Sequence, residues 1–367
     1  MIFEIILGCL IFFTATAYQV GHSFIETQEL VYKIGIPLLF ISSLYMKPKR
    51  WVINPILNIL PALALITIFF VPSNVLPTSI LALVYIFLGI LLFYLVANYS
   101  DFRGILPAIY GVIILNAVMV LLQATGHDPI CLNEARKHNT AMVGLFGFKY
   151  VFGAWMAIVT PLLLFKKKIL GIISGLLCIC SLSWACIGLM LSACVFTSYF
   201  LSRRLFAIVL VLAVVVGLVS YIFLLHKPDN PILTFKYKLN SRIELESKFL
   251  TTIMLKPYTG WGVGTFKLVG PSLVNNKTGN WGTMTDGWND YLERGVEMGL
   301  WGIALMVWLF VNAFKRFFRF KIDPTLAGSL AIVPFGIMFH NYFNHFSLSV
   351  LIICLFAWWE VKNLGEG

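Results

Sequence analysis

Polar side chains recur at helical spacing in the segment that runs from Asp286 to Gly299. The carboxyl and amide side chains that share one face of this segment are Asp286, Asn289 or Asp290, Glu293 and Glu297. They are three or four residues apart, so a helix here would carry an acidic face. A carboxylate held beside a bound polar substrate can act as a general base. The same spacing also suits a solvated face on which Asp290 pairs with Arg294.

Arginines in two other segments have the chemistry of anion ligands. Arg242 stands at the start of a predicted helix over about 242–255, where Ser241 and Glu244 have capping-box spacing. A helix N-terminus favours anions, and a guanidinium adds a bidentate clamp, so a lipid-linked phosphate or diphosphate would suit this site. The alternative is an arginine that meets lipid headgroups. Arg136 lies in a separate loop and is either a further ligand or a surface charge.

Two more motifs have a structural as well as a functional interpretation. Residues 260–264 read Gly-Trp-Gly-Val-Gly, but the motif follows no predicted strand and lacks a Gly-Lys-Ser/Thr ending, so it is not a nucleotide fingerprint. It predicts a tight turn with close backbone approach. His340 and His345 lie at the end of an apolar segment. They are either functional groups or polar side chains that reach water at an interface.

The composition indicates that membrane helices position these residues. Of the 367 residues, 59% are hydrophobic and 12% are charged, whereas soluble domains have about 25% charged residues. The apolar residues fall in blocks of about 17–25, the length of a membrane-spanning helix. The net charge of +11 lies in short clusters between these blocks, which argues against a nucleic-acid partner. The cysteines form no metal pattern, and the first block, 1–20, is interpreted as a retained helix rather than a signal peptide.

Hydropathy predicts an all-α polytopic membrane protein with a single transmembrane domain over 1–367 and about twelve transmembrane helices. The predicted spans are roughly 3–19, 30–46, 51–71, 77–98, 104–124, 148–165, 169–184, 186–201, 205–225, 296–315, 326–344 and 346–360. The seventh and eighth could instead form one kinked helix. Clusters of Lys and Arg favour two separate spans with both termini in the cytoplasm. The loops at about 125–147 and 226–295 then lie outside, and the longer one contains two short helices joined by the glycine turn.

The order of motifs resembles the O-antigen ligase and polymerase membrane glycosyltransferases. The similar region is 178–313, and the match is best from Ser241 to Phe310. In chain order, the matching residues are Arg242, Pro257, Gly262-Val-Gly264-Thr-Phe266, Trp288-Asn289-Asp290-Tyr291-Leu292, Glu297 and Gly299-Leu-Trp-Gly302. A weaker match is Gly144-Leu-Phe146-Gly147. The predicted spans and the large outside loop also agree with this family.

The resemblance implies transfer of a glycan from a polyprenyl-diphosphate carrier to an acceptor sugar hydroxyl, on a glycolipid or glycan, at the outer face of a bacterial inner membrane. Membrane lipids are the surrounding partners. No cofactor is implied, and no acidic metal-binding cluster is evident, so metal independence is expected. The implied substrate-binding residues are Arg242, Arg136, Arg294, Asn289, Tyr291 and Glu297.

The chain departs from this family at two positions. Trp288 stands where the family has a loop histidine that serves as the base, and an arginine of the family is missing near Ser183. Asp286, Glu293 and His340 are the candidate replacements for the base. Two alternatives follow: a polysaccharide or lipid transporter or flippase, and a non-catalytic member of a glycan-assembly complex. Transporters place ionisable groups near the bilayer midplane, where this chain offers neutral Asn116 and Gln123.

Overall fold

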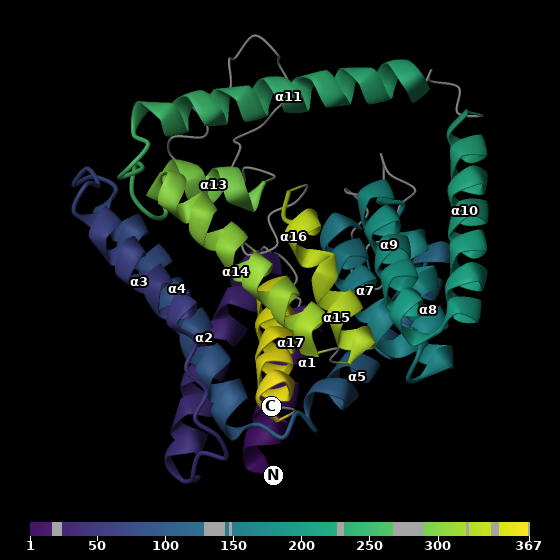
Figure 1. The fold of residues 1–367 in the computed structure, drawn as a ribbon, viewed down its shortest axis with the longest axis horizontal. Coiled ribbons are helices and arrows are strands. Elements are labelled where there is room, and N and C mark those ends of the chain that lie inside the picture. Colours follow the sequence, from purple (N-terminus) through teal and green to yellow (C-terminus); the bar gives the residue numbers. More distant parts are fainter. Residues whose placement is uncertain are drawn as a thin grey trace.

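A computed structural model describes residues 1–16, 24–127, 144–146, 149–225, 231–266, 289–320, 323–338 and 345–365. In these ranges all regular elements are helices, and there is no strand. The helices are α1 (Ile2–Thr16), α2 (Phe24–Leu44), α3 (Pro55–Ile68), α4 (Leu76–Tyr99), α5 (Ile105–Ala124), α7 (Lys149–Leu164), α8 (Lys168–Cys180), α9 (Trp184–Leu201), α10 (Arg203–Leu225), α11 (Pro231–Leu255), α13 (Asp290–Met298), α14 (Leu300–Phe320), α15 (Pro324–Ala331), α16 (Val333–Gly336) and α17 (Phe346–Gly365) (Figure 1).

Three of the described helices, α4, α5 and α9, are long and apolar enough to cross a membrane. This supports the expected helical membrane protein, but not the predicted count of about twelve spans. Several other apolar helices are too short, because α1, α3, α7 and α8 have between 13 and 16 residues and a span needs about 20. The longer α2 carries Glu29 and Lys33 within it.

The helix boundaries nevertheless follow the predicted segments closely. The seventh and eighth segments are separate helices, since α8 ends at Cys180 and α9 begins at Trp184. Between them Leu182 has a φ of 48°, which lies in the left-handed region and interrupts the helical path. The eleventh predicted segment, 326–344, is instead divided into α15 and the short α16.

Helix α7 forms the centre of the core. All of its residues from Val151 to Leu163 are buried, as expected for a helix that is hydrophobic on every side. It packs against α8, α9 and α15. Phe146, just before α7, lies against the rings of Phe152 and Trp155.

Two buried amides on α5 hold the turn that contains Phe146. The Gln123 side chain accepts a hydrogen bond from the Gly144 amide and donates one to its carbonyl, both at 3.2 Å. The Asn116 carbonyl oxygen accepts from the Leu145 amide at 2.8 Å. Gly144 has a φ of 53°, and a Cβ atom there would lie 2.2 Å from Asn116 Oδ1. The neutral polar side chains predicted within the fifth span therefore bind backbone groups of the chain itself.

Helix α11 lies across one end of the other helices, and both termini lie at the opposite end (Figure 1). It is longer than the predicted helix of about 242–255, because it begins at Pro231 and contains no interior Gly or Pro. Proline suits the first turn of a helix. The predicted capping box is therefore wrong, since Ser241 lies inside the helix. Arg242 is also within α11, so no helix N-terminus adds to its affinity for anions.

Candidate functional site

The short helix α13 carries most of the described candidate residues, and Asn289 is its N-cap. The Asn289 side-chain oxygen accepts hydrogen bonds from the amides of Tyr291 at 3.1 Å and Leu292 at 3.2 Å. This is the standard N-cap arrangement, in which a side chain satisfies amides at the helix start. Asn289 is thus a structural cap in this structure. The predicted second helix, expected to start near Asp286, is described from Asp290 onward.

The acidic face of α13 is not solvated. The exposed fractions of Asp290, Glu293 and Glu297 are 0%, 5% and 2%. The solvated alternative for this face is therefore wrong. Spacing alone did not reveal the packing, because α13 lies not only against the following helix α14 but also against α3 and α11, which come from distant parts of the chain.

Glu297 joins α13 to the glycine turn. One of its carboxylate oxygens accepts a hydrogen bond from the Gly264 amide at 2.8 Å. The other lies 2.5 Å from an Arg294 nitrogen. Its backbone carbonyl accepts from the Gly262 amide at 2.9 Å. Glu297, which the family resemblance assigned to substrate binding, therefore has partners for both carboxylate oxygens within the chain.

Arg294 is held in the same carboxylate cluster. Its side chain is 17% exposed. Burial alone would lower the pKa of its guanidinium, but neighbouring carboxylates raise that pKa above the usual value. Glu297 contributes most to this rise, followed by Glu293 and Asp290. Arg294 forms an ion pair with Glu297, three residues later, and the Asp290 carboxylate, its expected partner, also lies close enough to raise its pKa.

The turn that precedes this cluster depends on glycine, as the sequence predicted. Gly260 has a φ of 62°, and a Cβ atom there would lie 2.3 Å from the Glu297 carbonyl oxygen. At Gly299 the φ is 68°, and a Cβ atom would lie 2.4 Å from the Pro257 carbonyl oxygen. The Trp261 amide donates to the Val296 carbonyl at 2.9 Å. Such close backbone contacts exclude any larger residue.

Two contacts attach the start of α13 to α16. The Asp290 amide donates to the Ile337 carbonyl at 2.9 Å, and the Tyr291 hydroxyl donates to the Pro334 carbonyl at 3.2 Å. Burial, aided by the nearby Asp290 carboxylate, raises the pKa of Tyr291 to about 12. Tyr291 therefore stays protonated and serves as a hydrogen-bond donor at neutral pH.

Helix α11 covers an apolar side of α13. Phe249 and Ile253 of α11 form an apolar cluster with Leu292 and Val296 of α13, and with Phe266 beyond the glycine turn. The opposite face of α11 carries Ile243, Leu250 and Met254, all more than half exposed. That face is the apolar surface expected of a helix lying at a membrane interface.

His345 lies directly before α17 and is only 4% exposed. Its ring makes an edge contact with Tyr150 of α7, at 5.6 Å between centroids. Burial lowers the pKa of His345 to about 4, so the imidazole is neutral at pH 7. The interpretation in which this histidine reaches water at an interface is therefore wrong.

The remaining candidates fall partly or wholly beyond the described residues. Asp286, His340 and Arg136 lie outside them. Arg242 is described only as a backbone position on α11. Within the described ranges, no group of three or more His, Cys, Asp or Glu side chains is arranged to hold a metal ion.

The structure also reveals one essential partner that sequence reasoning missed, the Gly264 amide bound by Glu297. These two residues are 33 positions apart in the sequence. The only sequence signal for the contact was a glycine-rich turn followed later by an acidic helix. The described cluster thus combines three buried carboxylates, one partly buried guanidinium and a tyrosine hydroxyl beneath a surface helix. No family model matches this chain, and no curated protein matches it.

Proposed function

We propose that this chain is a membrane glycosyltransferase of the O-antigen ligase or polymerase type. It would move a glycan from a polyprenyl-diphosphate carrier to an acceptor sugar hydroxyl at the outer face of a bacterial inner membrane. The observation that carries the proposal is the charge buried on α13, where Asp290, Glu293 and Glu297 surround Arg294. Clusters of buried ionisable groups are enriched at functional sites, because burial tunes their proton affinity.

Glu293 is the described residue best suited to the base role. Of the three candidate bases, Asp286, Glu293 and His340, it is the one that lies within the described residues, and it stands on the acidic face of α13 with an exposed fraction of 5%. Its carboxylate would take the proton of the acceptor hydroxyl as that oxygen attacks the donor sugar. The carbon–oxygen bond to the carrier then breaks, and polyprenyl diphosphate leaves.

The diphosphate leaving group needs cations, and Arg242 remains the first candidate. Its helix, α11, covers α13 through the cluster around Phe249. Arg136 is a further candidate ligand, and Asp286 and His340 remain alternative bases. Arg294 would act through electrostatics within the cluster rather than as a free ligand, since it is paired with Glu297.

The proposal places α11 and α13 on the outer side and both termini in the cytoplasm. The exposed apolar face of α11 and its position at the end opposite to the termini (Figure 1) support this arrangement, as do the cationic clusters between the apolar blocks. On this topology, the helices that are too short to cross the bilayer singly would lie where the bilayer is locally thinner or where they pack against other helices.

Arg242→Ala should abolish glycan attachment or chain extension in the cells that make this protein, while the protein stays in the membrane. Loss of a charge that binds the diphosphate would leave lipid-linked glycan unused at the outer face. The measurement is the glycan profile on gels, with lipid-linked glycan quantified in the membrane fraction. Lys248→Ala is the matched control, because Lys248 lies on the same helix in an exposed pair with Glu244.

Normal surface glycan from the Arg242→Ala protein would remove this residue from the mechanism. Lipid-linked glycan that accumulates only on the cytoplasmic side would instead identify a flippase and refute the transferase.

A further inference from the structure

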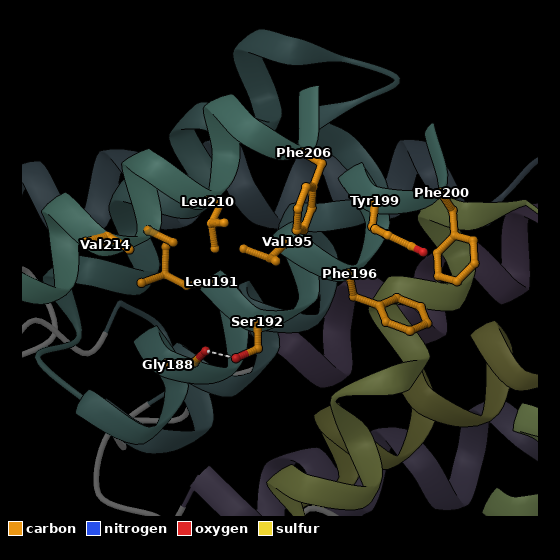
Figure 2. A pocket seen from close by; sticks show the side chains of 11 residues that line it. Gly188, Leu191, Ser192, Val195, Phe196, Tyr199, Phe200, Phe206, Leu210 and Val214 are labelled. Atoms are coloured by element: carbon orange, nitrogen blue, oxygen red, sulfur yellow. Dashed lines mark hydrogen bonds between the residues drawn. The ribbon is translucent and has the colours of Figure 1, made fainter. Parts of the chain in front are cut away.

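An apolar groove separates α9 from α10. It has a volume of about 730 Å³, and side chains from both helices point into it (Figure 2). The lining residues are Gly188, Leu191, Ser192, Val195, Phe196, Tyr199 and Phe200 of α9, and Phe206, Leu210, Ala213 and Val214 of α10. The Ser192 hydroxyl is not a polar feature of the groove, because it donates to the Gly188 carbonyl at 2.8 Å.

Helix α10 stands at the edge of the protein, which keeps the groove open. None of its residues from Arg203 to Val215 is buried. Leu210 and Val214, which line the groove, are 41% and 54% exposed. Because α9 is long and apolar enough to cross a membrane, the groove beside it would open to lipid rather than to water.

The length of the groove matches one leaflet of a bilayer. Its α9 lining runs from Gly188 to Phe200, which at about 1.5 Å per residue spans roughly 18 Å. The hydrocarbon core of a bilayer is about 30 Å thick, so a leaflet is about 15 Å deep. An acyl chain of ordinary phospholipid fills this depth, whereas a long polyprenyl chain would extend far beyond it.

Positive charge marks one end of the groove. Arg203 and Arg204, the first two residues of α10, lie next to the aromatic end formed by Tyr199, Phe200 and Phe206. Both arginine side chains are exposed, and the ion pairs between described residues involve other side chains. Basic sites beside membrane helices at the headgroup level recognise anionic lipids.

We propose that this groove binds one anionic phospholipid of the surrounding membrane, separately from the glycan site. An acyl chain lies between α9 and α10, and the phosphate headgroup lies at Arg203 and Arg204. The apolar lining, the leaflet length and the paired charges at one end together specify this ligand. The positive-inside rule assigns that end to the cytoplasmic leaflet.

The test is native mass spectrometry of the full chain after reconstitution with equal amounts of phosphatidylglycerol and phosphatidylcholine that carry identical acyl chains. We expect one phosphatidylglycerol retained per chain, in preference to phosphatidylcholine. Ala213→Phe should fill the groove and remove both lipids. Arg203→Gln/Arg204→Gln should lower the preference for phosphatidylglycerol by roughly twenty-fivefold, about fivefold for each arginine.

Two matched variants test whether lipid is lost because the groove is altered, rather than because any bulky residue is added to α10 or any two cations are removed. Val211→Phe enlarges a residue of the same helix that is 62% exposed and does not line the groove. Lys167→Gln/Lys168→Gln removes two adjacent exposed cations from another turn, that between α7 and α8. Both should retain phosphatidylglycerol as the unmodified chain does.

Equal retention of the two lipids by the unmodified chain would overturn the proposal. So would equal lipid loss from Ala213→Phe and Val211→Phe. A dimer that Ala213→Phe dissociates would show instead that a second copy of the chain covers the groove. The glycan site does not enter this test, so its outcome is independent of the proposed transferase activity.

Discussion

The Glu297→Ala protein should lose about 3 kcal/mol of its free energy of unfolding, the lower end of the usual effect of breaking a buried ion pair, because Glu293 and Asp290 still lie near Arg294. The variant leaves the Arg294 guanidinium in a site that is 17% exposed, without the carboxylate 2.5 Å away. It also removes the acceptor of the partly buried Gly264 amide, and an unsatisfied donor costs up to about 1–3 kcal/mol where water does not replace the acceptor. Thermal unfolding of the purified protein in detergent measures the effect.

Glu244→Ala is the control for this prediction. Glu244 pairs with Lys248 at 2.9 Å on α11, but its side chain is 59% exposed. Exposed helix pairs contribute about 0.3–0.5 kcal/mol, so this variant should unfold almost as the unmodified protein does. If Glu297→Ala were no less stable than Glu244→Ala, the account of Glu297 as the link between α13 and the glycine turn would be wrong.

Glu293→Gln should lower the rate of glycan transfer by a factor of about 10²–10⁴, the contribution typical of a general base. Glutamine keeps the size of the side chain but cannot accept the proton of the acceptor hydroxyl. The initial rate of transfer by purified protein measures the effect, with the melting temperature taken on the same samples to exclude unfolding. Glu293→Asp, which keeps a carboxylate, should retain part of the rate.

Glu360→Gln provides a matched change of a buried carboxylate elsewhere. Glu360 lies on α17, is 4% exposed and accepts a hydrogen bond from Asn54 at 2.9 Å. Its replacement should leave the transfer rate unchanged. Equal rates for Glu293→Gln and the unmodified protein, at equal stability, would transfer the base role to Asp286 or His340.

The positions of the helices were predictable because blocks of apolar residues have sharp ends. The separation of α8 from α9 followed from charge placement, and the structure locates it at Leu182. The number of spans was not predictable in this way. Hydropathy recognises apolar segments, but the helices that form in several of them are too short to cross a membrane singly.

The candidate site shows where sequence spacing stops being informative. Spacing placed the carboxylates of α13 on one face, but their burial depends on α3 and α11, which pack against α13 from distant parts of the chain, as well as on the following helix α14. The start of α11 was misplaced because Ser241 and Glu244 imitate a cap inside a helix that already began at Pro231. Asn289 has the side-chain chemistry of an N-cap, which sequence alone can recognise, whereas the family resemblance implied a role in substrate binding.

The most direct test of the central claim is transfer by the purified chain in lipid vesicles. The vesicles would contain polyprenyl-diphosphate-linked glycan, and an acceptor glycan would be supplied at the face that carries α11. The account predicts that free polyprenyl diphosphate and extended acceptor appear in equal amounts. Movement of intact lipid-linked glycan across the bilayer, with no polyprenyl diphosphate released, would contradict it.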